Sequence, residues 1–297
     1  MPVSQRLTAT HHFDLRTALH LASAAELVYA EPGLVEQTAL NSWRYAEFLF
    51  LDVESTQCLV AADPQSILVC FRGTEAERLE DWMADLDFSL VPGPWGGRVH
   101  EGFYDALSCV WHLLDNEVRR LQDAIPRRLW VTGHSLGAAL AALSVARWCE
   151  ARCPVAGLYT FGQPRTGDSD FARSFDFAFR PFAFRVVNHL DVITRAPPRS
   201  LGYQHLGTFV YLTDSGAVSD DIGWWQRFLT GWSGAVESIL DWGQQGLADH
   251  RMANYRQQIA AALRRQSDSG VASAAASLDQ PTAPTAATRL KPRRRAA

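Results

Sequence analysis

The chain contains no apolar run that is long enough to cross a membrane. A membrane-spanning helix needs roughly 18 or more apolar residues in succession, and no stretch of the 297 residues reaches that length. The first ten residues also lack the apolar segment of a secretory signal. We therefore expect no transmembrane segment. We expect a cytoplasmic protein, or one exported by a route that uses no signal peptide.

Cysteine is scarce, and positive charge is not in excess. The chain has five cysteines, an odd number whose spacing fits no zinc-binding pattern. We therefore expect reduced thiols with structural roles, and no metal site. The formal net charge of −4 argues against a nucleic-acid-binding surface. What the chain does contain is 47% hydrophobic residues, enough for one sizeable core.

Patterns typical of strands and helices alternate along the chain. Strands are predicted at 47–53, 58–62, 67–72, 128–132, 155–161, 182–188 and 207–213. Helices are predicted at 14–29, 105–121, 138–146, 221–245 and 249–264, the first with Asp14 as its N-cap. Strands interleaved with helices predict an α/β fold with a central, mostly parallel sheet that is flanked by helices.

The composition changes near residue 266. From there Ser, Ala, Thr and Pro dominate, aromatic residues are absent, and five basic residues stand against two acidic ones. Such a segment buries too little apolar surface to order itself. We therefore predict one domain over residues 1–265 and a disordered basic tail over 266–297.

The most informative segment is Gly133-His-Ser-Leu-Gly137, which fits the G-x-S-x-G pattern of a nucleophile elbow. A predicted strand precedes it, and an Ala/Leu-rich helix follows it. The turn is so tight that its flanking residues must be small. It lifts the Ser135 hydroxyl to the edge of the sheet, at the positive end of the helix. We therefore predict that Ser135 is a nucleophile.

A serine nucleophile needs a base that accepts its proton and an acid that holds the tautomer of the base. On α/β-hydrolase sheets the acid follows the serine in the chain, and the base follows the acid. Asp191, in the loop after strand 182–188, is the favoured acid. Asp168 and Asp170 are the alternatives, although Asp168 also suits the N-cap of a helix.

Three histidines follow the serine in the chain, namely His189, His205 and His250. The pattern favours His250, at the start of the last helix, over His205, which precedes a strand. His189 lies only two residues from Asp191, so we expect it to pack or to bond within the loop.

The tetrahedral intermediate also needs donors for its oxyanion. The backbone N–H of Leu136, the residue after the nucleophile, is one donor. Thr74, in the loop after strand 67–72, offers both an N–H and a hydroxyl. An ordinary turn at the end of the strand is the alternative interpretation of Gly73-Thr74, and the residues alone do not decide between the two.

At this point the sequence resembles the class 3 lipases, the fungal-lipase-like family of α/β-hydrolases. The resemblance extends over about residues 15–260. The matching segments, in order, are Phe71–Thr74, Trp82–Leu86, His100–Phe103, Gly133–Gly137, Thr160–Asp168, Arg185–Asp191 and Asp249–Tyr255. Several motifs in the right order are far more specific than any one of them alone.

The resemblance implies an α/β-hydrolase fold with an amphipathic lid helix, and a triad of Ser135, Asp191 and His250. It implies Thr74 and Leu136 as oxyanion donors and gives His250 precedence over His205. The implied function is a serine ester hydrolase, similar to triacylglycerol lipases, that cleaves fatty-acyl esters through an acyl-enzyme. This chemistry requires neither a metal nor an organic cofactor.

Two apolar segments bear on the substrate. Leu79, Trp82, Met83 and Leu86 form one face of a helix, which we interpret as a lid that opens at a lipid–water interface. A helix docked permanently on the core is the alternative. The Trp-rich stretch 222–242 either packs over the sheet, or forms a wall of the acyl pocket or an interfacial anchor.

Other functions compatible with the motifs are a phospholipase A1, a soluble carboxylesterase and an acyltransferase. A catalytically silent lipid-binding protein and a serine peptidase are less favoured, because the candidate triad is complete and nothing indicates a peptide-binding subdomain. The expected partner is a lipid ester, met at a transient lipid–water interface.

Overall fold

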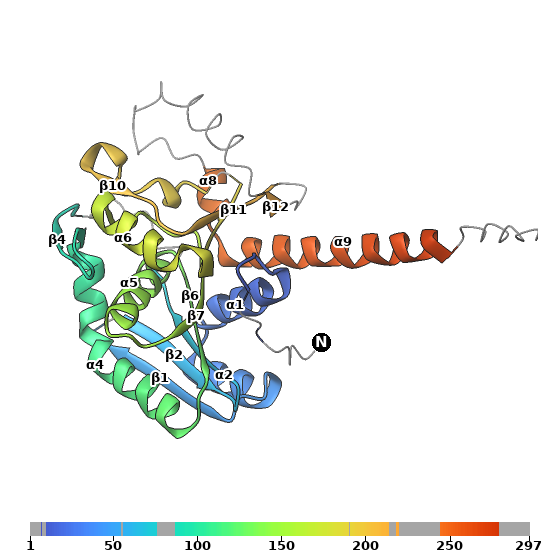
Figure 1. Ribbon diagram of the computed structural model, residues 1–297, viewed down its shortest axis with the longest axis horizontal. Coiled ribbons are helices and arrows are strands. Elements are labelled where there is room, and N and C mark those ends of the chain that lie inside the picture. Colours follow the sequence, from blue (N-terminus) through green and yellow to red (C-terminus); the bar gives the residue numbers. More distant parts are fainter. Residues whose placement is uncertain are drawn as a thin grey trace, which may run out of the picture.

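The computed structural model describes Leu7 and residues 10–54, 56–75, 87–189, 191–213, 218–219 and 244–278. Its main feature is an eight-stranded sheet in the order β1-β2-β3-β6-β7-β9-β11-β12 (Figure 1). The strands are β1 (Glu47–Val53), β2 (Thr56–Ala62), β3 (Ser66–Phe71), β6 (Arg128–His134), β7 (Val155–Phe161), β9 (Ala183–Asn188), β11 (Thr208–Leu212) and β12 (Val218–Ser219). The five strands from β3 to β11 are parallel, whereas β1, β2 and β12 pair antiparallel. The predicted mostly parallel sheet is confirmed.

A second, four-stranded sheet was not predicted. It has the order β10-β8-β5-β4. Its strands are β4 (Leu90–Pro92), β5 (Arg98–His100), β8 (Gly167–Asp168) and β10 (Tyr203–Gln204). Each has only two or three residues, too few to show the alternation of side chains that marks a strand in a sequence.

The helices flank the main sheet. They are α1 (Leu15–Leu27), α2 (Pro32–Gln37), the π-helix η1 (Thr38–Ser42), α4 (Glu101–Ala124), α5 (Leu136–Glu150), α6 (Ser169–Phe179), α8 (Gln244–Asp249) and α9 (Met252–Leu278). Short 3-10 helices lie at η3 (Arg180–Phe182), η4 (Ile193–Arg195) and η5 (Arg199–Leu201). Asp14 caps α1 as predicted, because its side chain accepts a hydrogen bond from the Thr17 N–H.

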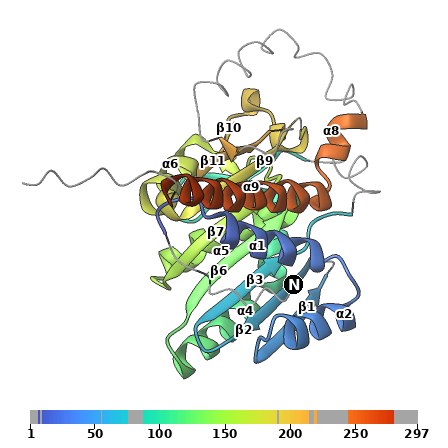
Figure 2. The ribbon, with the colours of Figure 1, turned by 90° about the vertical axis from the view of Figure 1, so that its right-hand side faces the viewer.

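Two apolar layers hold the helices to the sheet. On one face, Leu107 of α4 and Leu140 of α5 are buried in one core cluster with Leu158 of β7. On the opposite face, α1 packs against α9, and both helices contribute to a cluster that contains Tyr159 (Figure 2). The neighbours Leu158 and Tyr159 thus serve opposite layers, as the alternation of side chains along a strand requires.

Helix α9 differs from the predicted tail. It continues to Leu278, thirteen residues beyond the predicted domain end at 265, and projects from the body of the molecule (Figure 1). The stretch is rich in alanine, which has the highest helix propensity, and the first proline after it is Pro281. Side chains 264–268 are exposed, so this part of the helix packs little apolar surface. Residues 279–297 lie outside the described residues.

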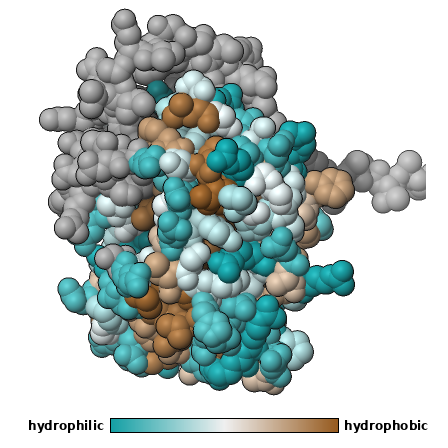
Figure 3. Space-filling view, turned by 90° about the vertical axis from the view of Figure 1, so that its left-hand side faces the viewer, coloured by the Kyte–Doolittle hydropathy of each residue, from teal (hydrophilic) through white to brown (hydrophobic). Residues whose placement is uncertain are grey.

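Two further predicted segments lie outside the described residues: the lid helix with Leu79 to Leu86, and the Trp-rich stretch 222–242. None of the described helices has both the length and the hydropathy that crossing a membrane requires. On the face over α4 and α6, apolar residues form small groups between hydrophilic ones (Figure 3). Leu113 of α4 and Phe177 of α6 are among the exposed apolar side chains of these helices.

Candidate active site

Ser135 lies at the junction of β6 and α5. Its φ of 57° is in the left-handed region, which non-glycine residues rarely adopt, so its backbone is strained. Both flanking glycines are required by space. A Cβ on Gly133 would lie 2.3 Å from the Gly137 carbonyl oxygen, and a Cβ on Gly137 would lie 2.3 Å from the Phe71 carbonyl oxygen. The structure therefore has the strand–turn–helix geometry of a nucleophile elbow.

Asp191 and His250 are brought together from segments 59 residues apart. The Nδ1 of His250 lies 2.8 Å from Oδ2 of Asp191, and both side chains are almost fully buried. The other carboxylate oxygen, Oδ1, accepts a hydrogen bond of 2.9 Å from the Ile193 N–H. The pair has the geometry in which an aspartate fixes the tautomer and the orientation of a base.

Two residues around this pair were not among the predicted site residues, although Gly162 belongs to a motif expected to be structural. Tyr255, on α9, donates its hydroxyl to Asp191 Oδ2, the oxygen that also bonds His250. Gly162, directly after β7, has a φ of +60°, and a Cβ on it would lie 2.7 Å from Cε1 of His250. The Thr160–Asp168 and Asp249–Tyr255 motifs contain both residues, but a motif does not indicate which atoms they touch.

The reactive atoms of the predicted nucleophile and base are buried without partners. Neither Ser135 Oγ nor His250 Nε2 has a hydrogen-bond partner among the described residues. Ser135 is 0% exposed. A hydrogen bond between nucleophile and base is often loose in an enzyme without substrate, and it tightens only in the complex. Neither atom is therefore engaged by another described group.

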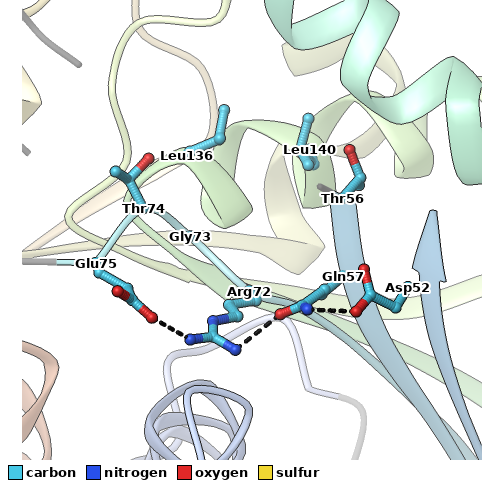
Figure 4. A pocket seen from close by; sticks show the side chains of 9 residues that line it. All are labelled: Asp52, Thr56, Gln57, Arg72, Gly73, Thr74, Glu75, Leu136 and Leu140. Carbon is cyan, nitrogen blue, oxygen red and sulfur yellow. Dashed lines mark hydrogen bonds and ion pairs between the residues drawn. The ribbon is translucent and has the colours of Figure 1, made fainter. Parts of the chain in front are cut away.

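The loop after β3 runs beside the elbow. A Cβ on Gly73 would lie 3.1 Å from the Ser135 Cβ. Thr74 and Leu136 line the same end of a pocket of about 560 Å³ (Figure 4). The structure therefore places both predicted oxyanion donors next to the predicted nucleophile.

The opposite wall of this pocket is polar (Figure 4). Arg72 donates to the Gln57 side-chain oxygen at 2.7 Å and to Glu75 at 2.5 Å, and the Gln57 amide donates to Asp52 at 2.7 Å. The wall thus carries two carboxylates and one guanidinium, and the guanidinium is already engaged. No local sequence pattern indicates this wall, because the pairing of β1 with β2 brings Asp52 to Gln57 and the pairing of β2 with β3 brings Gln57 to Arg72.

The alternative acids have other roles. Asp168 caps α6, since its carboxylate accepts hydrogen bonds from the Asp170 and Phe171 N–H groups. Asp170 forms an exposed ion pair with Arg173 at 2.7 Å. Neither of them contacts a histidine among the described residues.

The alternative bases are also engaged elsewhere. His189 bonds Asp249 at 3.0 Å. His205 lies close to several arginines, and its pKa is lowered well below its ordinary value, first by burial and then by the charge of Arg185. The structure therefore pairs Asp191 with His250, and it packs His250 against His134, the residue directly before Ser135.

Three or more His, Cys, Asp or Glu side chains that could hold a metal ion are not grouped anywhere in the described part of the chain. The five cysteines form no disulfide.

Sheet order, elbow and Asp–His pair together define an α/β-hydrolase with a serine–histidine–aspartate arrangement. Residues 68–201 match the family model described as lipase (class 3). On this match and the similarities that follow, residues 68–201 form a class 3 lipase segment within the chain.

Curated relatives share part of the chain. It is 36% identical over 171 residues to phospholipase A1-II 1 of Oryza sativa subsp. indica, covering 48% of this chain and 42% of the relative. It is 33% identical over 172 residues to a lipase of Rhizomucor miehei, covering 55% and 47%. It is 28% identical over 245 residues to triacylglycerol lipase OBL1 of Arabidopsis thaliana, covering 63% and 47%. The chain thus spans less than half the length of these relatives.

Solved structures show the same fold. The triacylglyceride lipase of Rhizomucor miehei superposes with a TM-score of 0.58 at 27% identity, covering 66% of this chain and 79% of that one. A structure described as a triacylglycerol lipase whose catalytic centre is a serine protease triad superposes with a TM-score of 0.57 at 26% identity, covering 67% and 80%.

Proposed function

We propose that the protein is a serine ester hydrolase that cleaves fatty-acyl esters, as triacylglycerol lipases do, through an acyl-enzyme. The observation that carries the proposal is the buried 2.8 Å pair of His250 and Asp191 in a fold whose only strained elbow serine is Ser135 among the described residues. A serine hydroxyl is a weak nucleophile until such a base accepts its proton.

The chemistry proceeds in two halves. In the first, Ser135 Oγ attacks the ester carbonyl carbon while His250 Nε2 accepts the hydroxyl proton, and Asp191 stabilises the imidazolium that forms. The N–H groups of Thr74 and Leu136 donate to the oxyanion. His250 then protonates the leaving alcohol. In the second half, water gives a proton to His250 and attacks the acyl carbon, and the Ser135 Oγ–acyl bond breaks as His250 returns the proton to Oγ and the fatty acid leaves.

The substrate reaches the nucleophile only after a movement. Since Ser135 is 0% exposed, an ester of any size needs an opening step before attack. We propose that this step occurs at a lipid–water interface, where displaced apolar side chains are stabilised by lipid. The partner is then a lipid ester in an aggregate rather than a dissolved one.

A phospholipase A1 activity is the second candidate, and it rests on the 36% identity to a rice protein of that name. The polar wall of the pocket favours a neutral ester instead. Its guanidinium already donates to Gln57 and Glu75, and the wall carries one carboxylate in excess, which opposes a phosphate. A soluble carboxylesterase and a catalytically silent lipid-binding protein are outcomes of the test below.

The test is hydrolysis of p-nitrophenyl esters from C2 to C16, with and without a detergent or lipid interface. We expect turnover that prefers long acyl chains and rises with the interface, and a fall of about 10⁵- to 10⁶-fold in kcat for Ser135→Ala. Ser144→Ala is the matched control, because Ser144 lies on the same helix and its hydroxyl bonds only the Ala141 carbonyl. Activity limited to short, dissolved esters would indicate a carboxylesterase. Vesicle binding without turnover would indicate the silent lipid-binding protein.

A further inference from the structure

A series of hydrogen bonds, here called the Tyr29–His134–His250 series, runs from the oxyanion loop to the base. Tyr29 lies just beyond the end of α1, and His134 is the last residue of β6, directly before the nucleophile. The Tyr29 hydroxyl lies 2.9 Å from His134 Nδ1, and His134 Nε2 lies 2.6 Å from the backbone carbonyl oxygen of His250. Neither Tyr29 nor His134 has a part in the chemistry proposed above.

The direction of each hydrogen bond follows from the chemistry of the groups. The carbonyl oxygen of His250 can only accept, so Nε2 of His134 carries the proton. In a neutral imidazole the other nitrogen, Nδ1, then accepts, and the Tyr29 hydroxyl donates to it. The ring is neutral because burial, and next the nearby His250, lower the pKa of His134 well below its ordinary value. One tautomer of His134 thus satisfies both of its hydrogen bonds, the one from Tyr29 and the one to the His250 carbonyl oxygen.

Tyr29, at the other end of this series of hydrogen bonds, touches the oxyanion loop. A Cβ on Gly73 would lie 2.5 Å from the Tyr29 hydroxyl oxygen, so this hydroxyl is in contact with the loop that carries Thr74. The Arg72 guanidinium lies over the Tyr29 ring, 5.5 Å from its centroid. The position of Tyr29 is therefore coupled to the position of the loop, through both its ring and its hydroxyl.

The His134 ring also packs against the base itself. The two imidazole centroids are 4.4 Å apart with an interplanar angle of 33°. Because His250 becomes an imidazolium during each half of the reaction, a charged neighbour at this distance would oppose catalysis. The neutral tautomer of His134 gives support to the ring without this repulsion.

We propose that Tyr29 and His134 are positioning residues that hold the oxyanion loop and His250 at a fixed distance from Ser135. The inference rests on the proposed hydrolase function. Loss of the Tyr29 hydroxyl leaves the polypeptide packing nearly unchanged, but it releases the His134 ring and the contact with Gly73. A misplacement of about 1 Å between reacting groups can reduce the rate by roughly 100-fold.

The test compares two tyrosines in equivalent surroundings. Tyr29→Phe removes the hydroxyl that bonds His134. Tyr45→Phe is the control, because the Tyr45 hydroxyl also lies 2.9 Å from a nitrogen of a buried histidine, His20. Both residues of the control pair lie far in the sequence from the predicted triad. We expect kcat to fall about 10- to 100-fold in Tyr29→Phe with little change in KM, and to stay within about 2-fold of wild type in Tyr45→Phe. The concentration of active enzyme is measured with a p-nitrophenyl phosphonate that labels Ser135.

A second pair of variants keeps the test valid if the effect is one of folding. His134→Phe removes both hydrogen bonds and keeps a ring, and His20→Phe is its control. If the hydrogen bonds from Tyr29 through His134 to His250 act as a unit, the double variant Tyr29→Phe/His134→Phe loses no more activity than His134→Phe alone. Equal losses of thermal stability in the two tyrosine variants, with unchanged kcat in both, would overturn the proposal. Absence of turnover in the wild type would instead overturn the hydrolase function.

Discussion

At the scale of single residues, the carboxylate of Asp191 is the most constrained group of the site. Its two oxygens receive hydrogen bonds from His250, Tyr255 and the Ile193 N–H. An aspartate that is 2% exposed needs such donors, because a buried charge without partners costs several kcal/mol. The donors also keep the acid where the imidazolium forms.

Tyr255→Phe tests this constraint. Removing the hydroxyl takes one donor from Asp191 and leaves the aromatic ring in the core. A hydrogen bond to a charged group contributes about 1.5–3 kcal/mol, so we expect kcat/KM to fall at least about 10-fold. Tyr159→Phe is the control, since Tyr159 is a buried tyrosine whose hydroxyl accepts from the Asp14 N–H on another part of the fold. Wild-type kcat/KM across the pH range in Tyr255→Phe would contradict the role.

The residue scale is also where the sequence was most informative. The tight turn at Ser135 requires small neighbours, and that requirement is visible as Gly133 and Gly137. The choice between Asp191 and Asp168 is not visible in the same way, because both follow a strand. Only the fold shows that Asp168 caps a helix while Asp191 meets a histidine. The contacts of Tyr29 and Tyr255 depend on segments more than 60 residues away, which no local pattern reports.

At the scale of elements, the polar wall of the pocket sets the charge next to the oxyanion donors. Glu75 engages Arg72, and both line the pocket with Thr74 and Leu136 (Figure 4). An anionic head group that enters this pocket meets two carboxylates and a guanidinium that is already engaged. The β1–β2 hairpin and the oxyanion loop together therefore give this wall an excess of negative charge.

Glu75→Gln removes one of these carboxylates and weakens the hold on Arg72. We expect the rate on anionic phosphatidylglycerol vesicles, relative to a neutral diacylglycerol emulsion, to rise about 2- to 5-fold. The effect is small because interactions of exposed charges are weak, and Glu75 is half exposed. Glu36→Gln, an exposed change on α2 outside the pocket lining, should leave the ratio unchanged. A ratio that falls in Glu75→Gln would show that the wall does not select against anions.

Elements differ in how well the sequence predicts them. Seven of the eight strands of the main sheet have five to seven residues and appear within two residues of their predicted bounds, whereas the two-residue β12 was not predicted. The second sheet has strands of two or three residues, which are stabilised by their partners and carry no pattern of their own. Helix α9 is longer than predicted. Its alanines continue the helix beyond residue 265, where low hydrophobicity predicted a disordered segment.

At the scale of the whole molecule, the two faces of the sheet divide the work. The face with α4 and α5 is almost entirely apolar in its core. The face with α1 and α9 supplies Tyr29 beyond the end of α1, and it supplies Tyr255 from within α9. The sequence predicted both of these helices, but not that they meet across one face of the sheet and bring groups to the site. That meeting is a property of the topology. Helix α1 comes before the edge strand β1 in the chain and α9 comes after the opposite edge strand β12, yet the two helices pack together over the middle of the sheet, where β6 and β7 lie.

The whole molecule also carries several histidines that folding keeps uncharged. Burial lowers the pKa of His20 to about 4 and that of His100 to about 4, and it lowers the pKa of His134 well below its ordinary value. In the unfolded chain these side chains titrate near 6.5. Between pH 6.5 and about 4, the unfolded state therefore binds protons that the folded state does not.

This difference makes the free energy of unfolding depend on pH with a definite sign. The stability that these uncharged histidines contribute is fully present above pH 6.5. It is lost as the pH falls toward 4, because the unfolded state binds more protons in that window. Each such histidine contributes a slope of about 1.4 kcal/mol per pH unit. Urea unfolding measured between pH 7.5 and 4.5 should show the loss, and His20→Leu should reduce the slope by about one proton. The control is His112→Leu on α4, which removes an exposed histidine in place of a buried one. If His20→Leu keeps the wild-type slope, His20 is charged in the folded protein, and its hydrogen bond to Tyr45 must be that of an imidazolium.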